Sequence, residues 1–207
     1  MIRRKTRANS RSWATGLAAV ALLISAAIPA TVGAASPVTP LCHGLPATIV
    51  GQPGQVAIRG TQGPDVIVGL EVGVRIDGRG GDDTICAGAG DNIVNAGAGN
   101  DWVDAGEGNN TVDGAEGDDT ILAGSGDDIL LGGTGNDTVF AGEGDNLVST
   151  GSGNDVIVAG SGNDRIDGAK DFDTCDGGAG LNYVGHCEAV PSDHPTIPPA
   201  TPDQLTA

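Results

Sequence analysis

GGTGNDTVF, which runs from Gly132 to Phe140, fits the nine-residue pattern G-G-x-G-x-D-x-U-x, in which U is a large aliphatic residue. The stretches AGSGDDILL (123–131) and AGSGNDRID (159–167) fit it as well. Residues 51–185 divide into fifteen consecutive units of this length without an insertion or a deletion. A fixed short period is typical of repeat architectures in which each unit stacks on its neighbours. The nine positions of a unit are called slots one to nine below.

The spacing of aliphatic residues predicts short strands. Slot eight is aliphatic in nearly every unit, whereas slots seven and nine beside it are mixed. This pattern favours a three-residue strand that points one side chain inward. Slots one to six are rich in glycine, as chain reversals require. Two strands and two turns then make one coil of eighteen residues, so the predicted fold is all-β: a right-handed parallel β-roll, or β-solenoid.

Slot six places acidic residues on the edges of this roll. Alternate units turn at opposite edges, so slot six repeats every eighteen residues along each edge. The first edge, called the aspartate edge, carries Asp65, Asp83, Asp101, Asp119, Asp137, Asp155 and Asp173. The second, called the mixed edge, carries Val56, Val74, Asn92, Asn110, Asp128, Asn146, Asp164 and Asn182. Hard divalent cations prefer oxygen ligands that include carboxylates. The sequence therefore predicts a row of cations along the aspartate edge and weaker or partial binding opposite.

The repeats resemble those of the RTX (repeats-in-toxin), or haemolysin-type, calcium-binding proteins, over about two thirds of the chain. The resemblance implies Ca²⁺ as the cofactor, held between successive turns by slot-six carboxylates and turn carbonyls, and a fold that forms only with calcium. Carried over, the metal ligands are the seven residues of the aspartate edge, with Asp128 and Asp164 on the poorer edge. Slot five adds carboxylates that are expected to raise the local negative potential without ligating: Asp82, Asp91, Asp118, Asp127 and Asp145.

Composition leaves one alternative for the repeats and excludes one partner. High charge and few aromatic residues also mark flexible acidic linkers. A linker, however, has no reason to hold an aliphatic residue at every ninth position. Without calcium we expect disorder, because rows of carboxylates repel and three-residue strands do not persist alone. The formal net charge of -17 repels phosphate backbones, so nucleic acid is not an expected partner.

The flanking segments give the domain organisation. Residues 1–35 combine a basic start, an apolar run from Trp13 to Ile28 and Val32-Gly33-Ala34, which predicts a Sec-type signal peptide cleaved near Ala34 or Ala35. The alternative is a retained membrane anchor, although the run is shorter than the roughly twenty residues that span a bilayer. Residues 36–50 are expected to form a cap and 51–185 the roll. The proline-rich tail, within 186–207, is not expected to continue the strands.

Four cysteines agree with a secreted, extracellular protein, with cell-surface association as an option and no membrane span in the mature chain. Three pairings are possible. We favour Cys42 with Cys86 and Cys175 with Cys187, because each pair then staples one end of the roll. Zinc held by reduced cysteines beside His43 and His186 is the alternative. Stapled ends protect the open strand edges, so a monomer is expected.

No enzyme is expected. The three histidines, which include His194, lie outside the repeats, and no nucleophile motif is present. Paired carboxylates also occur in glycosidases, but the fixed nine-residue recurrence of these carboxylates is explained by metal binding. The chain resembles small secreted bacterial RTX proteins without an effector domain. It is expected to be a calcium-responsive extracellular structural or surface-associated module.

The alternative function is calcium-dependent binding of a cell-surface polysaccharide or a protein through an outward sheet face. One such face carries an expected row of apolar residues: Leu122, Phe140 and Val158 beside Trp102. Basic residues that would grip an acidic glycan are few. Ice binding is a third option, but the threonine row that it needs in slot seven is interrupted.

Overall fold

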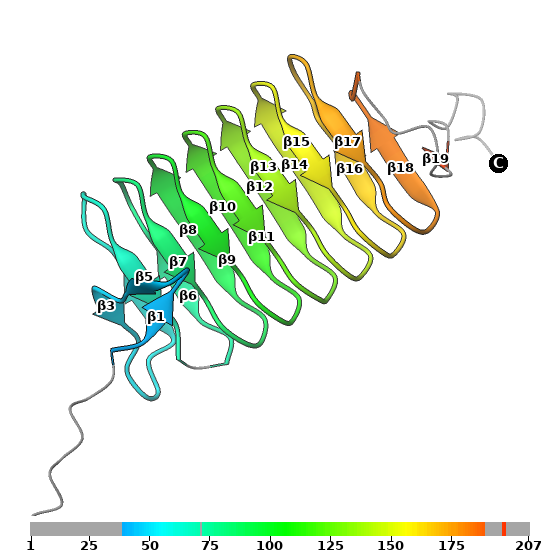
Figure 1. Ribbon diagram of the computed structural model, residues 1–207. Coiled ribbons are helices and arrows are strands. Elements are labelled where there is room, and N and C mark those ends of the chain that lie inside the picture. The colour runs from blue at the N-terminus through cyan, green and yellow to red at the C-terminus, as the bar shows by residue number, and fades with distance from the viewer. Residues whose placement is uncertain (1–38, 71, 189–195, 198–207) are drawn as a thin grey trace, which may run out of the picture. The chain divides into compact units, whose positions relative to one another are not determined.

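The computed structural model describes residues 39–70, 72–188 and 196–197, and this part of the chain consists of strands and turns without a helix. Figure 1 shows short parallel strands in two layers that stack along one axis. The eight-stranded sheet contains β3 (Ile49–Val50), β5 (Val66–Val68), β7 (Thr84–Cys86), β9 (Trp102–Asp104), β11 (Thr120–Leu122), β13 (Thr138–Phe140), β15 (Val156–Val158) and β17 (Thr174–Asp176).

The nine-stranded sheet forms the second layer. It contains β4 (Ala57–Arg59), β6 (Arg75–Asp77), β8 (Ile93–Ala98), β10 (Thr111–Glu116), β12 (Ile129–Thr134), β14 (Leu147–Ser152), β16 (Arg165–Asp167), β18 (Asn182–Gly185) and β19 (Thr196–Ile197). The chain alternates between the two sheets from β3 to β18. The predicted parallel β-roll is confirmed, with two strands in each coil.

The register of the sheets follows the nine-residue period. Ile121 pairs with Val139 in the eight-stranded sheet, and Val112 pairs with Leu130 in the nine-stranded sheet, so each slot-eight residue lies on the one eighteen positions away. From Ile58 to Cys175, every slot-eight side chain is at most 3% exposed and belongs to one hydrophobic cluster. Full burial of such a side chain contributes about 1.5–3 kcal/mol. The core is therefore a double column of aliphatic residues along the axis.

Tight turns explain the recurring glycine in slot four. Gly153 has a φ of +130°, and a Cβ added there would lie 1.8 Å from the carbonyl oxygen of Gly135, one coil earlier. No larger residue fits such a contact without moving the backbone. Asp171 occupies slot four where glycine is expected and still adopts a positive φ of 76°.

Both ends of the roll are closed by disulfides. Cys42, in the antiparallel hairpin of β1 (Leu41–Cys42) and β2 (Leu45–Pro46), bonds to Cys86 of β7. Cys175 bonds to Cys187. The favoured pairing is confirmed, and because no described cysteine is free, the zinc alternative is not supported.

Three features differ from the sequence-based expectations. Ile49 of β3 pairs with Ile67, so the roll begins within the segment assigned to the cap. The tail was expected not to continue the strands, which is wrong for Thr196 and Ile197, because β19 pairs with β18. These two residues retain the N–H groups that the flanking prolines lack. Finally, the ring of His43 lies 4.2 Å from that of Trp102, so the β1–β2 hairpin contacts part of the expected outward row.

Candidate metal centre

Slot six lies at the point where each turn enters a strand. On the aspartate edge, every aspartate directly precedes a strand of the eight-stranded sheet, from Asp65 before β5 to Asp173 before β17. All seven side chains are buried, with Asp65 the most exposed at 6%. The side chains therefore point from the turns into the interior of the roll, along its whole aspartate edge. The structure brings the seven predicted ligands of the aspartate edge together as one row, whereas Asp128 and Asp164 lie on the mixed edge, before β12 and β16.

One oxygen of each carboxylate joins neighbouring coils. The backbone N–H of Asp101 donates to Oδ1 of Asp119 at 2.8 Å, and the N–H of Asp119 donates to Oδ1 of Asp137 at 2.9 Å. The same bond recurs along the whole edge, from the N–H of Asp65 to Oδ1 of Asp83 and onward to Asp173. Each aspartate from Asp83 to Asp173 thus satisfies a buried N–H of the preceding coil.

The other oxygen of these carboxylates has no hydrogen-bond partner. Among the described residues, buried Oδ2 atoms without a partner belong to Asp83, Asp101, Asp119, Asp128, Asp137, Asp155, Asp164 and Asp173. These are eight of the nine predicted metal ligands. An unpaired buried carboxylate oxygen is strongly unfavourable unless a cation or a proton compensates it. The residues present therefore fit a bound cation.

Turn carbonyls border the same space. A Cβ added to Gly132, in slot one, would lie 2.3 Å from Oδ2 of Asp137 and 2.8 Å from the carbonyl oxygen of Thr150 in the next coil. At Gly114 the corresponding distances are 2.4 Å to Oδ2 of Asp119 and 2.6 Å to the carbonyl oxygen of Gly132. A carboxylate oxygen and a carbonyl oxygen thus converge beside each of these glycines. Such oxygens are the ligands that hard cations prefer.

Backbone groups are needed to complete any coordination sphere. Among the described residues, no three His, Cys, Asp or Glu side chains gather into a ready metal cluster. Calcium takes six to eight oxygen ligands, which include backbone carbonyls as well as carboxylates. A cation on this edge would therefore use slot-six carboxylates together with the carbonyl oxygens of the turns.

Burial makes the ionised form of these carboxyls unfavourable without a cation. Desolvation raises the pKa of Asp83 and Asp119 to about 7, and that of Asp101 and Asp137 to about 6. The backbone N–H groups that donate to the carboxylates oppose this rise. The pKa of Asp173 is raised as well, again chiefly by desolvation. A divalent cation would reverse the balance by stabilising the charged form.

The slot-five carboxylates form a second ladder, which runs the other way. Asp82 Oδ1 accepts the N–H of Asn100 at 2.9 Å, and Asp118 Oδ1 accepts the N–H of Asn136 at 2.7 Å, both in the following coil. Asp91, Asp127 and Asp145 accept in the same way. Slot-five side chains therefore bind the next coil, whereas slot-six side chains bind the preceding one.

The slot-five residues also act through their charge. The carboxylate of Asp82 contributes to the raised pKa values of Asp83 and Asp101, and that of Asp118 to those of Asp119 and Asp137. This supports the expectation that slot five adds negative potential. The ladder itself was not foreseen, because side-chain direction is not encoded in the nine-residue pattern.

The two ends of the aspartate edge differ from its middle. Oδ2 of Asp65 accepts the N–H of Thr61 at 2.7 Å, so this aspartate has no free buried oxygen. At the other end, the N–H of Asp173 donates to Oε2 of Glu188 at 2.7 Å. Glu188 thus accepts the hydrogen bond that a slot-six aspartate of a further coil would accept. Sequence reasoning missed it because it lies fifteen rather than eighteen positions after Asp173.

The residue in slot one also differs between the two edges. The sequence alone could have shown this difference. Beside the aspartates, slot one is most often glycine, at positions 60, 78, 114, 132 and 168. On the mixed edge it is alanine in five successive units, at positions 87, 105, 123, 141 and 159. Glycine leaves the space that the Oδ2 atoms and carbonyls border. Ala96 and Thr150 are exceptions on the aspartate edge.

Comparison with known proteins identifies the repeat. The model of the family described as RTX calcium-binding nonapeptide repeat (4 copies) matches residues 59–94, 87–121, 113–148, 122–157 and 149–184. The chain belongs to this RTX family. RTX repeats bind Ca²⁺, so calcium is the metal to consider at these carboxylates. The family is a structural calcium-binding module and not a class of enzymes. No curated protein and no solved structure matches the chain.

The predicted signal peptide and the possibility of a membrane span remain to be compared with the structure. The signal peptide expected over 1–35 lies outside the described residues. Within the part that the structure describes, no helix has the length and apolar character to cross a membrane.

Proposed function

We propose that this protein is a secreted calcium-binding module whose roll is held folded by Ca²⁺ along the aspartate edge. The buried Oδ2 atoms without partners carry this proposal. The ions would be held by Asp83, Asp101, Asp119, Asp137, Asp155 and Asp173, together with turn carbonyls. Asp65 would contribute more weakly at the first coil, because its Oδ2 atom already accepts the N–H of Thr61. Asp128 and Asp164 would hold ions more weakly on the mixed edge.

Each residue type has a separate task in this proposal. The slot-six carboxylate binds the ion through Oδ2 and the preceding coil through Oδ1. The slot-one glycine leaves room beside Oδ2, as at Gly132. When bound, calcium supplies the positive charge that compensates the buried, ionised carboxylates. Because only the folded chain presents this row, binding stabilises the fold by mass action. A secreted chain would meet calcium outside the cell, where it is plentiful.

A calcium titration of the chain without residues 1–35, with its disulfides oxidised, tests the proposal. Far-ultraviolet circular dichroism and bound ions per chain are followed together. We expect a coil-to-β transition with about six tight ions, one for each interval between successive aspartates of the aspartate edge. Magnesium should be a poor substitute, because it requires a smaller, near-octahedral site. Absence of both binding and structural response would refute the proposal.

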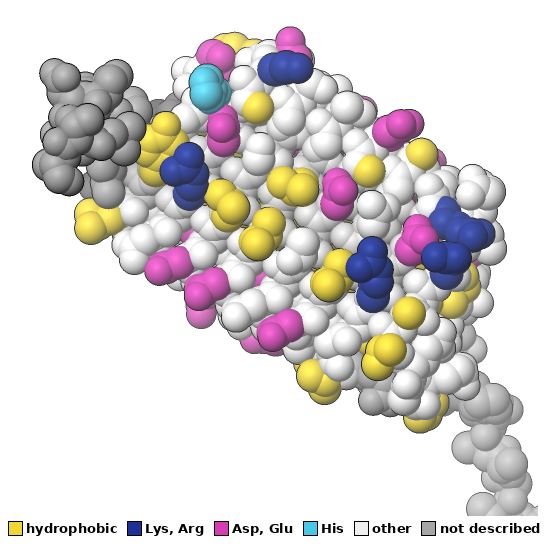
Figure 2. Space-filling model, turned by 180° about the vertical axis from the view of Figure 1, so that it is seen from behind, with side chains coloured by type: hydrophobic (Ala, Val, Ile, Leu, Met, Phe, Trp, Pro, Cys, Tyr) yellow, Lys and Arg dark blue, Asp and Glu magenta, His cyan; other side chains and the backbone are white. Residues whose placement is uncertain are grey.

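A second candidate function is partner binding by the outer face of the nine-stranded sheet. Slot seven of four neighbouring strands forms a row on this face. In the order β8, β10, β12 and β14, the row consists of Ile93, Thr111, Ile129 and Leu147. All three aliphatic side chains are exposed, as is Leu131. Figure 2 shows hydrophobic side chains on this face between Lys and Arg side chains at either end. This face replaces the expected row on the other sheet as the stronger candidate.

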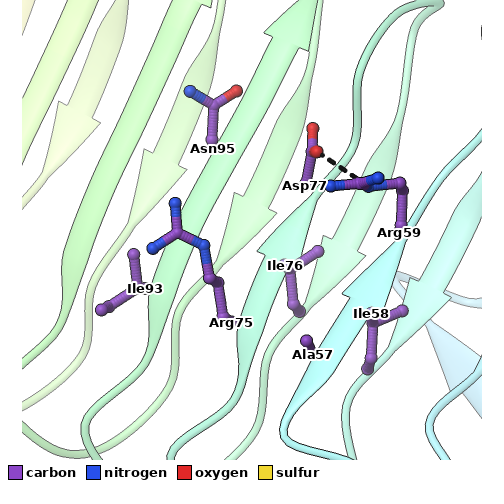
Figure 3. Close-up of a pocket in the computed structure, with 8 residues that line it drawn as sticks. All are labelled: Ala57, Ile58, Arg59, Arg75, Ile76, Asp77, Ile93 and Asn95. Carbon is purple, nitrogen blue, oxygen red and sulfur yellow. Dashed lines mark hydrogen bonds and ion pairs between the residues drawn. The ribbon is translucent and has the colours of Figure 1, made fainter.

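The cationic end of this face contains a pocket of about 410 Å³ (Figure 3). Arg59 Nε lies 3.1 Å from Oδ2 of Asp77, whereas Arg75 has no ion pair among the described residues. Ile93 and Asn95 line the pocket beside Arg75. A free guanidinium next to aliphatic side chains favours an acidic partner with apolar groups. We propose a polypeptide, because a hydroxyl-rich glycan would leave the aliphatic row without apolar contacts.

A labelled peptide of alternating leucine and glutamate probes this second function, by fluorescence anisotropy in saturating calcium. We expect wild-type protein to bind and Ile129→Ser to bind at least several-fold more weakly. Thr120→Ser, on the opposite sheet, is the control that should leave binding unchanged. Binding of an acidic oligosaccharide in place of the peptide would show that the partner is a glycan. Binding of neither probe would argue against this surface.

A further inference from the structure

The mixed edge has the same backbone arrangement as the aspartate edge but a different side-chain chemistry. From Asn92 to Asn182 its slot-six residues are also buried, and their Oδ1 atoms make the same bonds to the preceding coil. The N–H of Asn92 donates to Oδ1 of Asn110 at 3.0 Å, and the N–H of Asp128 donates to Oδ1 of Asn146 at 2.9 Å. Asparagine and aspartate are therefore interchangeable in this first contact.

The second side-chain atom separates the two residue types. Nδ2 of Asn110 donates to the carbonyl oxygen of Gly108 at 2.8 Å, and more distantly to those of Gly106 at 3.3 Å and Ala123 at 3.4 Å. Nδ2 of Asn92 donates to the carbonyl oxygens of Gly88 at 3.1 Å and Ala105 at 2.9 Å.

The other asparagines repeat this arrangement. Nδ2 of Asn146 donates to the carbonyl oxygen of Gly144 at 3.1 Å, and Nδ2 of Asn182 donates to the carbonyl oxygens of Gly177 and Gly178. The acceptors lie in slots one, two and four of the turns. The amide therefore occupies the space that these turn carbonyls surround.

An aspartate in the same place presents an oxygen where the amide presents two N–H groups. An ionised carboxylate oxygen cannot donate to a carbonyl, and the eight buried Oδ2 atoms without partners are those of slot-six aspartates. No slot-six asparagine leaves its Nδ2 unpaired among the described residues. A buried polar group without a partner is unfavourable, because it has lost its hydrogen bonds to water. The amide removes that penalty without a metal, whereas an ionised carboxylate requires a cation.

We infer that slot-six asparagine is a built-in substitute for calcium: its side-chain amide satisfies the turn carbonyls that an ion would otherwise bind. The residue in slot six then determines, at each turn, whether the turn carbonyls are satisfied by a bound ion or by a side-chain amide. This inference rests on the calcium-binding function proposed above and specifies which turns use it.

The order of residues on the mixed edge sharpens the inference. Asp128 and Asp164 stand between asparagines, so no two successive positions there are both aspartate. An ion beside either residue would face one carboxylate and one amide, whose N–H groups point their positive ends at the cation. Intervals with two aspartates exist only on the aspartate edge. The mixed edge should therefore hold few ions or none with high affinity.

Exchanging single residues tests the inference by counting bound ions. Asn146→Asp places three aspartates in succession on the mixed edge and should add up to two calcium ions per chain. Asp137→Asn interrupts the aspartate edge and should remove two. Asn109→Asp is the control, because it adds the same charge to an exposed slot-five position and should leave the count unchanged. Ions are counted by equilibrium dialysis with radioactive calcium, and folding is checked by circular dichroism.

The possible outcomes separate this inference from the function on which it rests. If wild-type protein binds no calcium, the proposed function fails. If wild-type protein binds calcium but folded Asn146→Asp or Asp137→Asn protein retains the wild-type count, the inference fails alone. If Asn146→Asp does not fold in calcium, Asn110→Asp replaces it, and this variant should add one ion in the interval shared with Asp128. An unchanged count in that variant would also overturn the inference.

Discussion

Removing calcium should reverse the way in which the stability of the roll depends on pH. Without metal, burial raises the pKa of Asp83, Asp101, Asp119, Asp128 and Asp137 to about 6 or 7. The unfolded chain has carboxyl pKa values near 3.9. The folded, metal-free chain therefore binds more protons. Its stability is fully present below about pH 4 and is lost as the pH rises through 6 to 7.

The size of the effect follows from the number of protons. Each proton that the folded chain retains and the unfolded chain has released changes the unfolding free energy by about 1.4 kcal/mol per pH unit. Five such carboxyls give an upper limit of about 7 kcal/mol per pH unit. Typical domains have a total stability of about 5–15 kcal/mol. One or two pH units should therefore suffice to unfold the metal-free roll.

Saturating calcium should give the opposite slope. Calcium binds the deprotonated carboxylates, so acid competes with the metal and stability increases with pH over the same window. Circular dichroism from pH 4.5 to 7.5 measures both cases, in calcium-depleted buffer and in excess calcium. If the depleted protein gained β-structure with rising pH, the assignment of buried, metal-requiring carboxyls would be wrong.

Three further perturbations test the packing of the roll by urea unfolding in excess calcium. Gly153→Ala should destabilise it by more than about 1–2 kcal/mol, because strain at positive φ adds to the contact with Gly135; an unchanged midpoint would contradict this turn geometry. Leu130→Ala should destabilise it by about 2–5 kcal/mol and Leu131→Ala by less than about 1 kcal/mol, and equal losses would contradict the inward direction of slot eight. Replacing the amino-terminal disulfide, whose cysteines are 44 positions apart, should lower the unfolding free energy by about 4 kcal/mol. Replacing the carboxy-terminal disulfide, whose cysteines are 12 positions apart, should lower it by about 3 kcal/mol.

The repeat region was predictable because one local period specifies both the strand and its register. Slot eight fixes the inward side chain, and stacking at eighteen residues then places Ile121 on Val139 without further information. The same period separated the aspartate edge from the mixed edge. It also led to the carboxylates whose Oδ2 atoms prove to be buried without partners. The position of these carboxylates follows from repetition, so the sequence was sufficient to place them in a row.

The ends of the roll were less predictable, because the period no longer applies there. Glu188 replaces a slot-six residue from outside the register, and Thr61 uses the Oδ2 atom of Asp65 that the pattern assigns to a metal. The contact between His43 and Trp102 depends on how the hairpin folds onto the sheet. These contacts are tertiary and leave no periodic signal. The partner-binding face also escaped prediction, since side-chain exposure on two similar sheets depends on such neighbours.

The two opposed ladders constrain how the length of this protein can change. Their bonds within the repeats join residues eighteen positions apart, such as Asp119 and Asp137 in slot six, or Asp118 and Asn136 in slot five. Inserting or deleting eighteen residues preserves each remaining partnership and changes only the number of coils. A change of nine residues instead moves everything downstream to the opposite edge, where aspartates would meet asparagines. Insertions and deletions that preserve the roll should therefore comprise two repeats, or eighteen residues, although the sequence pattern itself repeats every nine residues.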